Sequence, residues 1–165
     1  MKRVIGRIAL GAVLLAVWLL LTQPVTTPEL IAGLIVSALV ALLPAPGARV
    51  YEEFPLTPKR IVFALAYIWV FLAAMVRSNV DVAFRVLHPR LPINPGIVRV
   101  RTRLKSRLGR LILANSITLT PGTITVDVDG EDLYVHWLSV SSEDVEENTK
   151  SIVGGFEKYL EVIFG

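Results

Sequence analysis

Three long apolar stretches without a charged residue occupy the first half of this chain and indicate a membrane protein. They are residues 8–21, 30–48 and 61–76, and the apolar part of the second ends at Leu43, before two prolines. A helix that crosses a bilayer needs about 20 apolar residues, with about 17 as the lower limit. With flanking uncharged residues each stretch just reaches that limit, and the Leu, Ala and Val content predicts helices.

The short neutral linker at residues 22–28 predicts that the first two stretches form a helical hairpin. Pro28 followed by Glu29 suits the first turn of a helix, where proline needs no N–H partner and an acid meets the positive end of the dipole. A secretory signal peptide is disfavoured, because no small-x-small cleavage site follows Leu21.

The composition is divided between the two halves. Of the 165 residues 53% are apolar, with the excess in the first 80, so we expect a transmembrane helical region at 1–88 and a small α/β domain at 97–165. There are no cysteines, which excludes disulfides, zinc–thiolate and iron–sulfur sites and thiol catalysis. We expect no cofactor and no bound metal.

No ionisable residue lies in the middle of an apolar stretch; Arg7, Glu29, Arg77 and Asp81 are all near the ends. Ion and proton pathways through membranes need Asp, Glu, Lys or His at membrane depth. The sequence therefore predicts that this chain does not itself conduct the ion.

The basic residues give conflicting evidence on topology. If all three stretches cross the bilayer, six Lys/Arg on the side of the N-terminus oppose eleven on the side of the C-terminus. Only Arg77, Arg85 and Arg90 of those eleven lie close to the membrane, so the positive-inside rule would place the C-terminal part outside. If one stretch does not cross, every basic cluster faces the same side.

Alternating and helical patterns in residues 97–163 predict the order strand, helix, strand, strand, helix. The strands are expected at 97–104, 123–128 and 133–140, and the last helix follows a capping box at Ser141 and Asp144. In the second strand we expect Ile124, Val126 and Val128 to point inward. Residues 120–123, Thr-Pro-Gly-Thr, predict a type II turn, and Asp129-Gly130 predicts a hairpin.

The segment ANSITLTPGTITVDVDGEDLYVHWL, with the Leu113 that precedes it, resembles the E subunit of Mrp/Mnh-type multisubunit cation/proton antiporters. The same subunit type occurs in archaeal membrane-bound hydrogenases and related complexes. The resemblance implies other antiporter-type membrane subunits as partners, and a cytoplasmic C-terminal domain in a multi-pass protein of the cell membrane.

Catalytic interpretations of single residues are weak. Ser116, Asp127 and His136 have the residue types of a triad, but Ser116 lies in no nucleophile-elbow sequence. The acidic residues from Asp127 to Asp132 lack the spacing of an EF-hand, so a solvated hairpin tip is favoured. We therefore expect no enzyme activity from this chain by itself.

Two groups of residues are candidate contacts with lipid or with neighbouring subunits. The first is Arg99, Arg101 and Arg103 in the basic run 99–110, which suits anionic head groups or an acidic partner, or is a solvated face; nucleic acid is disfavoured. The second is Asn115, Thr118 and Thr120, which either cap a helix and shape the turn or dock against a partner.

Two functions remain open. The first is an accessory, non-catalytic membrane subunit of a Na+/proton antiporter complex, or of the antiporter module of a respiratory complex, that scaffolds its neighbours. The alternative is a free-standing membrane-anchored domain that binds an anionic lipid or ligand through residues 99–110.

Overall fold

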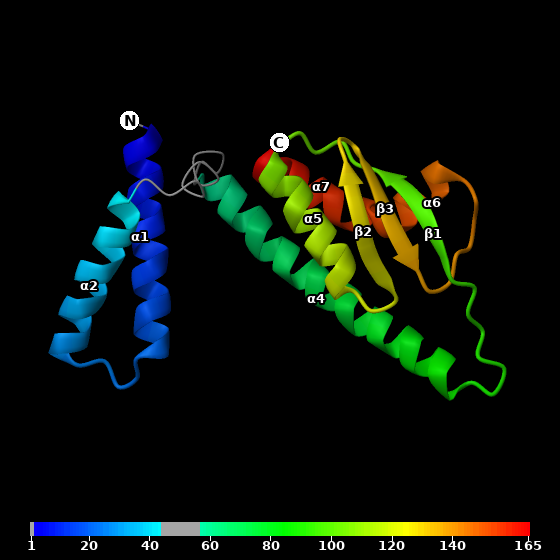
Figure 1. The fold of residues 1–165 in the computed structure, drawn as a ribbon, viewed down its shortest axis with the longest axis horizontal. Coiled ribbons are helices and arrows are strands. Elements are labelled where there is room, and N and C mark those ends of the chain that lie inside the picture. The colour runs from blue at the N-terminus through cyan, green and yellow to red at the C-terminus, as the bar shows by residue number, and fades with distance from the viewer. Residues whose placement is uncertain (1, 44–56) are drawn as a thin grey trace. The chain divides into compact units, whose positions relative to one another are not determined.

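A computed structural model of the chain describes residues 2–43 and 57–165. It divides into two compact units, Met1–Pro55 and Leu56–Gly165, called here the N-terminal and the C-terminal unit. The described part contains six helices and one three-stranded antiparallel sheet, and all the strands belong to the C-terminal unit (Figure 1).

The N-terminal unit is a helical hairpin of α1 (Lys2–Leu21) and α2 (Thr27–Leu42). Helix α2 begins as its sequence predicts: Pro28 lies in the first turn, and the Glu29 carboxylate accepts a hydrogen bond from the backbone N–H of Thr26 at 3.1 Å. The second apolar stretch continues beyond Leu43 into residues that lie outside the described part.

Small residues let the two helices approach closely. Gly33, Ser37 and Ala41 repeat every four residues along α2 and are its buried positions. Close helix contact through such small residues is typical of packing in membranes. The indole ring of Trp18 in α1 lies over Gly33, and its Nε1 donates a hydrogen bond to the carbonyl oxygen of Glu29 at 3.1 Å.

We expect Gly33→Ala to weaken the hairpin by about 1–3 kcal/mol, the usual cost of an overpacked contact. A Cβ at this position would lie 2.6 Å from Cδ1 of Trp18, so the indole must move. The measurement is SDS-induced unfolding followed by fluorescence in a chain whose single tryptophan is Trp18. Gly11→Ala is the matched control, because its Cβ would meet Ala41 at an ordinary 3.6 Å; equal effects at the two glycines would contradict the packing.

The sheet of the C-terminal unit has the strand order β1-β3-β2, with β1 (Gly96–Arg101), β2 (Thr123–Asp129) and β3 (Asp132–Trp137). The predicted Asp129-Gly130 turn joins β2 and β3, and Gly130 has the positive φ of +59° that such a turn requires. Helix α5 (Arg107–Leu119) connects β1 to β2 and packs against β2.

The core of this unit lies between the sheet and its helices. Its fully buried side chains come from every layer: Val100, Leu113, Leu133, Val135, Val153 and Leu160. The alternation predicted for the first strand is confirmed, since Val98 and Val100 are buried while Arg99 is exposed. The strand ends at Arg101, three residues earlier than expected.

The prediction for the faces of β2 is wrong. Ile124, Val126 and Val128 are exposed by 55%, 58% and 40%, and the hydroxyls of Thr123 and Thr125 bond to α5 instead. Thr125 donates a hydrogen bond to the carbonyl oxygen of Ala114 at 3.0 Å. A bulge between Thr125 and Asp127 also shifts the register, which breaks the simple alternation.

The last predicted helix is divided into two, α6 (Val145–Ile152) and α7 (Gly154–Phe164). The break falls at Val153, just before two glycines, which weaken helix continuity. The cap also differs from the prediction: the carboxylate of Asp144, not Ser141, accepts from the backbone N–H of Glu146 at 2.6 Å.

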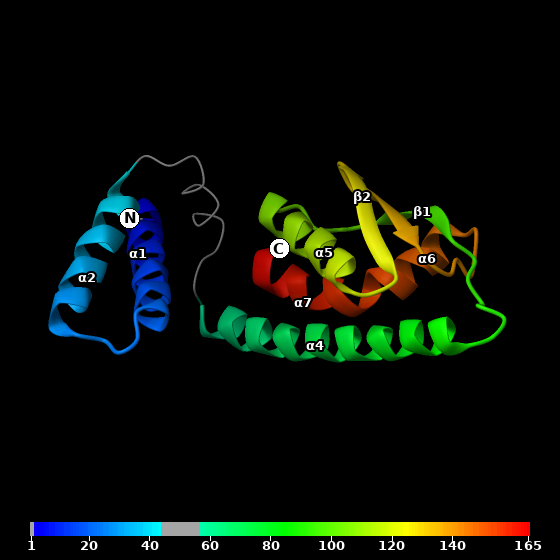
Figure 2. The same ribbon diagram turned by 60° about the horizontal axis from the view of Figure 1, so that its bottom comes forward.

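Helix α4 (Pro58–Leu87) is 30 residues long and belongs to the C-terminal unit. Among the described residues it alone is long and apolar enough to cross a membrane by length and composition; the apolar parts of α1 and α2 are shorter. The three apolar stretches thus fall on α1, α2 and α4, and the number that cross stays a prediction. Figure 2 shows α4 running along the rest of its unit, with α7 beside it.

Candidate functional site

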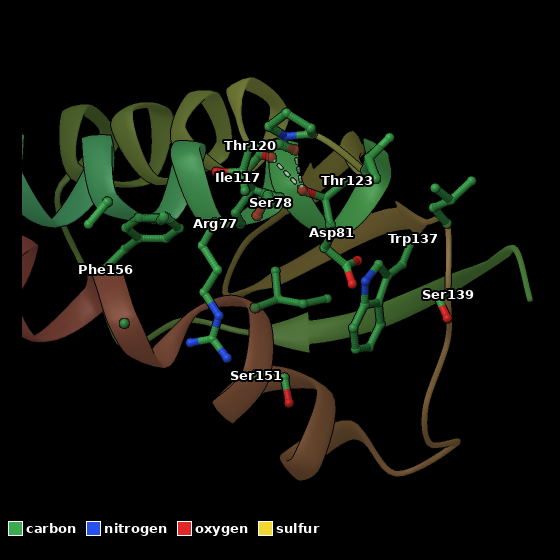
Figure 3. Close-up of a pocket in the computed structure, with 18 of the residues that line it drawn as sticks. Arg77, Ser78, Asp81, Ile117, Thr120, Thr123, Trp137, Ser139, Ser151 and Phe156 are labelled. Carbon is green, nitrogen blue, oxygen red and sulfur yellow. Dashed lines mark hydrogen bonds between the residues drawn. The ribbon is translucent and has the colours of Figure 1, made fainter. Parts of the chain in front are cut away.

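A hollow of about 650 Å³ lies between α4 and the turn that follows α5. Its walls come from the second half of α4, the turn at residues 120–123, the end of β3 and the junction of α6 with α7. The side chains of Arg77, Asp81 and Trp137 project into this space (Figure 3). The volume is in the range of small-ligand sites, and the lining is mainly apolar with a few charged and hydroxyl side chains among it.

The predicted turn forms one wall of the hollow. Thr123 donates its backbone N–H to the carbonyl oxygen of Thr120 at 3.3 Å, and Gly122 has a φ of +91°, as the third position of a type II turn requires. The Thr123 hydroxyl caps α5 by donating to the carbonyl oxygen of Ile117 at 2.6 Å (Figure 3). The turn lies against α4, because a Cβ on Gly122 would be 3.5 Å from Val82.

Arg85 fixes the C-terminal end of α4 to the sheet. Its guanidinium contacts the Asp81 carboxylate at 2.7 and 3.3 Å and donates to the carbonyl oxygen of Pro92 and the hydroxyl of Ser139. Arg77, one turn before Asp81, extends into the hollow toward the helix that carries Ser151 (Figure 3). The hollow therefore combines one cation, one ion pair and several hydroxyl groups, which suits a polar or acidic segment of another molecule.

Aromatic rings fix the first half of α4 to α7. Tyr67 and Phe71 both contact the ring of Phe156, with centroid distances of 6.2 and 6.5 Å. The Tyr67 hydroxyl is also hydrogen-bonded to the hydroxyl of Ser116 in α5. The Ser116 hydroxyl thus bonds to Tyr67 and to the carbonyl oxygen of Ile112, and neither His136 nor Asp127 is among its partners, so the triad interpretation has no geometric support.

The candidate arginines Arg99, Arg101 and Arg103 lie along the outer side of β1 and the loop after it, in a shallow groove with α6, away from the hollow. Each has an acidic neighbour in the same chain. Arg99 and Arg101 lie 3.9 and 3.2 Å from the Asp132 carboxylate, and Arg103 lies 3.6 Å from Glu157. Exposed pairs of this kind contribute little stability, and they leave the arginines reachable from solvent.

Glu157 is the one buried carboxylate among the described residues, with an exposed fraction of 5%. It accepts hydrogen bonds from the Thr102 hydroxyl at 2.6 Å and from the backbone N–H of Arg103 at 2.7 Å. These bonds connect α7 to the end of β1. The carboxylate is satisfied within the fold, so its role here is structural.

The second candidate group is divided between two roles. Thr120 lines the hollow, but its hydroxyl donates to the carbonyl oxygen of Ser116 at 2.7 Å. The Thr118 hydroxyl accepts from the backbone N–H of Thr125 at 3.1 Å, while Asn115 is exposed on α5. Among residues 2–43 and 57–165 no three Asp, Glu or His side chains are grouped closely enough to hold a metal ion.

Sequence reasoning missed the contact of α4 with the α/β layer. Phe63, Tyr67 and Phe71 recur every four residues, which places three aromatic rings on one side of the helix. That spacing was the available signal. The buried Glu157 had no comparable signal, because its partners lie about 55 positions away in sequence.

These features define a helical membrane protein that carries a small α/β unit packed on its longest helix. A family model described as Na+/H+ ion antiporter subunit matches residues 11–163, so this chain belongs to that family. The family predicted from residues 113–138, that of the E subunit, is thereby confirmed.

The chain is similar to relatives over nearly its whole length. It is 28% identical to the E subunit of the Na(+)/H(+) antiporter of Alkalihalophilus pseudofirmus over 154 residues, which cover 93% of this chain and 95% of the relative. It is 29% identical over 161 residues to the E1 subunit of the antiporter of Staphylococcus haemolyticus, at 93% and 94% coverage. A chain in the structure of the membrane-bound sulfane sulfur reductase, an archaeal respiratory membrane complex, is 46% identical with a TM-score of 0.80, at 96% and 99% coverage.

Proposed function

We propose that this chain is an accessory, non-catalytic subunit of a multisubunit membrane complex that contains an antiporter module. The observation that carries this proposal is the match to the sulfane sulfur reductase chain, which covers 96% of this chain and 99% of that one. The match extends over nearly the whole of both chains, which supports the same kind of role for this chain. The complex is either a cation/proton antiporter or a respiratory complex with such a module.

Its role in that complex is to hold neighbouring subunits and not to carry the ion. Of the charged residues of α4, which the structure describes in full, Arg60, Arg77, Asp81 and Arg85 contact or face the α/β layer, and Lys59 lies in the first turn; Arg7 and Glu29 lie near the ends of α1 and α2. We assign three surfaces to contact with partners. They are the hollow with Arg77 and Thr120, the exposed residues Asn115 and Thr118 on α5, and the outer arginines Arg99, Arg101 and Arg103. We assign the α/β unit to the cytoplasmic side of a multi-pass or hairpin-anchored protein, as the family resemblance implies.

The free-standing binding domain is the weaker candidate. A site for anionic ligands in the arginine groove would need cations without acidic neighbours. Asp132 and Glu157 supply carboxylates within 4 Å of all three arginines. The groove therefore has mixed charge and offers little selectivity for an anion.

Purification from the native membrane distinguishes the two functions. With a C-terminal tag and a mild detergent, we expect several polytopic subunits to elute with this chain in fixed stoichiometry.

As a matched test, Arg77→Gln alters the hollow without touching the core, and we expect it to lower the yield of co-eluting subunits several-fold. A wild-type chain that elutes as a stable monomer would support the binding domain instead.

A further inference from the structure

Helix α4 has two sides of opposite character. One side carries its aromatic and charged contacts to the C-terminal unit. On the other side an outer stripe of exposed apolar residues, with exposed fractions between 40% and 83%, runs along the helix: Ile61, Leu65, Trp69, Leu72, Val76, Val80 and Leu87. All five charged residues of α4, which is described from end to end, lie off this stripe.

The contacts of α4 with its own unit extend over nearly its whole length. They begin at Arg60, which donates to the carbonyl oxygen of Gly165 at 3.3 Å, and end at Arg85, which donates to Ser139. At 1.5 Å per residue these positions are about 38 Å apart. The hydrocarbon core of a bilayer is only about 30 Å thick.

This length excludes a simple crossing by α4. If the helix crossed the bilayer, the α/β layer packed along it would enter the hydrocarbon with it. That layer contains exposed charges, including Arg101, Arg103 and Asp127, and each would be placed at membrane depth at high cost. The outer stripe needs an apolar environment and the opposite side needs water, which is the condition at a membrane surface.

The basic residues agree with a helix that does not cross. If only α1 and α2 cross, the hairpin returns the chain to the side of its N-terminus. All 17 Lys and Arg then face the same side, and the conflict between the six N-terminal and the eleven C-terminal ones disappears. The positive-inside rule identifies that side as the cytoplasm.

A lipid surface fits the outer stripe better than a protein does. Protein interfaces combine an apolar centre with a polar rim and about one hydrogen bond per 100–200 Å². The stripe offers aliphatic side chains and one indole, and the amide of its neighbour Asn79 is already bonded to the carbonyl oxygen of Met75 at 2.9 Å. Lys59 in the first turn of α4 and Arg90 just after its end are both exposed, and from these positions they can reach anionic head groups.

We propose that α4 lies along the cytoplasmic surface of the membrane, with its outer stripe inserted among the lipid acyl chains. The α/β layer then rests on the polar side of the helix, outside the bilayer. This placement does not depend on the proposed function, because a free-standing chain would show it equally.

The first test is the side of the membrane that each segment faces. The chain has no cysteines, so single cysteines can be introduced without removing any. In the full chain in cell membranes, Lys59→Cys and Asp129→Cys are expected to react with a membrane-impermeant maleimide only from the cytoplasmic side. Val25→Cys, between α1 and α2, should react only from the opposite side. Reaction of Lys59→Cys and Asp129→Cys from opposite sides would show that α4 crosses and would overturn the proposal.

The second test is depth. Bimane attached to Ile61→Cys, Leu72→Cys or Leu87→Cys is expected to be quenched to a similar extent by lipids brominated near the head group, and several-fold more than bimane on Ser78→Cys, which faces the hollow. A crossing helix would instead give its deepest position at Leu72. Absent quenching along the stripe, with cross-linking to another subunit, would mean that a protein covers it and would also overturn the proposal. Co-purification of partner subunits is measured in a separate experiment. A failure of the proposed function and a failure of this membrane placement can therefore be told apart.

Discussion

Replacing Phe156 by alanine is expected to lower the free energy of unfolding of the C-terminal unit by about 3–5 kcal/mol, the range for truncating a buried phenylalanine. Phe156 is 6% exposed and is the ring on which both Tyr67 and Phe71 rest. Its loss would leave a cavity between α7 and α4. We therefore expect α4 to loosen from the α/β layer before the sheet itself unfolds.

Urea unfolding of the full chain in mild detergent measures this effect, with Trp137 as the only tryptophan. Hydrogen exchange then reports whether the backbone amides of α4 lose protection first. Phe84→Ala is the matched control, because Phe84 lies on the same helix but is 64% exposed; its effect should stay within about 0.5–1 kcal/mol. Similar losses for the two phenylalanines would mean that Phe156 does not hold α4.

Glu157→Ala is the second substitution with a large expected effect, about 2–3 kcal/mol. The carboxylate accepts from Thr102 and from the backbone N–H of Arg103, and both donors would remain buried or half-buried without a partner. Glu157→Gln should lose less, because the amide oxygen can still accept one of the two bonds. The order alanine, then glutamine, then wild type is the expected ranking of stabilities from lowest to highest.

The same unfolding assay measures this series. Glu161, one turn later in α7, is the control: its carboxylate lies 3.8 Å from Arg103, with a side chain 41% exposed. Removing it should change stability by no more than about 0.5 kcal/mol, as for most exposed ion pairs. If Glu161→Ala were as damaging as Glu157→Ala, the ion pair with Arg103 would matter more than the buried hydrogen bonds.

Local chemistry made part of the C-terminal unit predictable. The turn at residues 120–123 and the hairpin at Asp129-Gly130 depend on proline and on glycines with positive φ, so a few adjacent residues determine them. The alternation of arginine and valine in β1 was equally local. Family membership was predicted from residues 113–138, the segment that contains both turns.

Tertiary contacts explain what the sequence did not reveal. In β2, Ile124 and Thr125 compete for the inward position, and threonine occupies it because its hydroxyl needs an acceptor, which the carbonyl oxygen of Ala114 in α5 supplies. Pattern reasoning ranks isoleucine as the more buried residue and cannot see that need. The candidate site shows the same limit. Thr120 was predicted from the sequence as a contact residue, whereas Arg77 belongs to the site only because α4 lies beside the turn in the fold.

The apolar stretch in α4 fits two arrangements. Residues 61–76 have the length and composition of a spanning helix, and hydropathy alone does not separate a crossing from a helix with one apolar side. The aromatic residues at positions 63, 67 and 71 mark the side of the helix that meets Phe156 and Tyr159. The small-residue repeat at 33, 37 and 41 is a sequence signal for the close packing of the hairpin.

The two sides of α4 should tolerate mutation very differently. On the outer stripe any aliphatic residue meets the same fluid surroundings, so exchanges such as Leu65→Ile or Val76→Leu should be nearly neutral in a saturation library scored for protein abundance. On the side of Phe63 and Tyr67 the neighbours are fixed in shape, and equally conservative exchanges should be depleted. A periodicity of three to four residues in that mutational map would therefore record the orientation of the helix without any structural measurement.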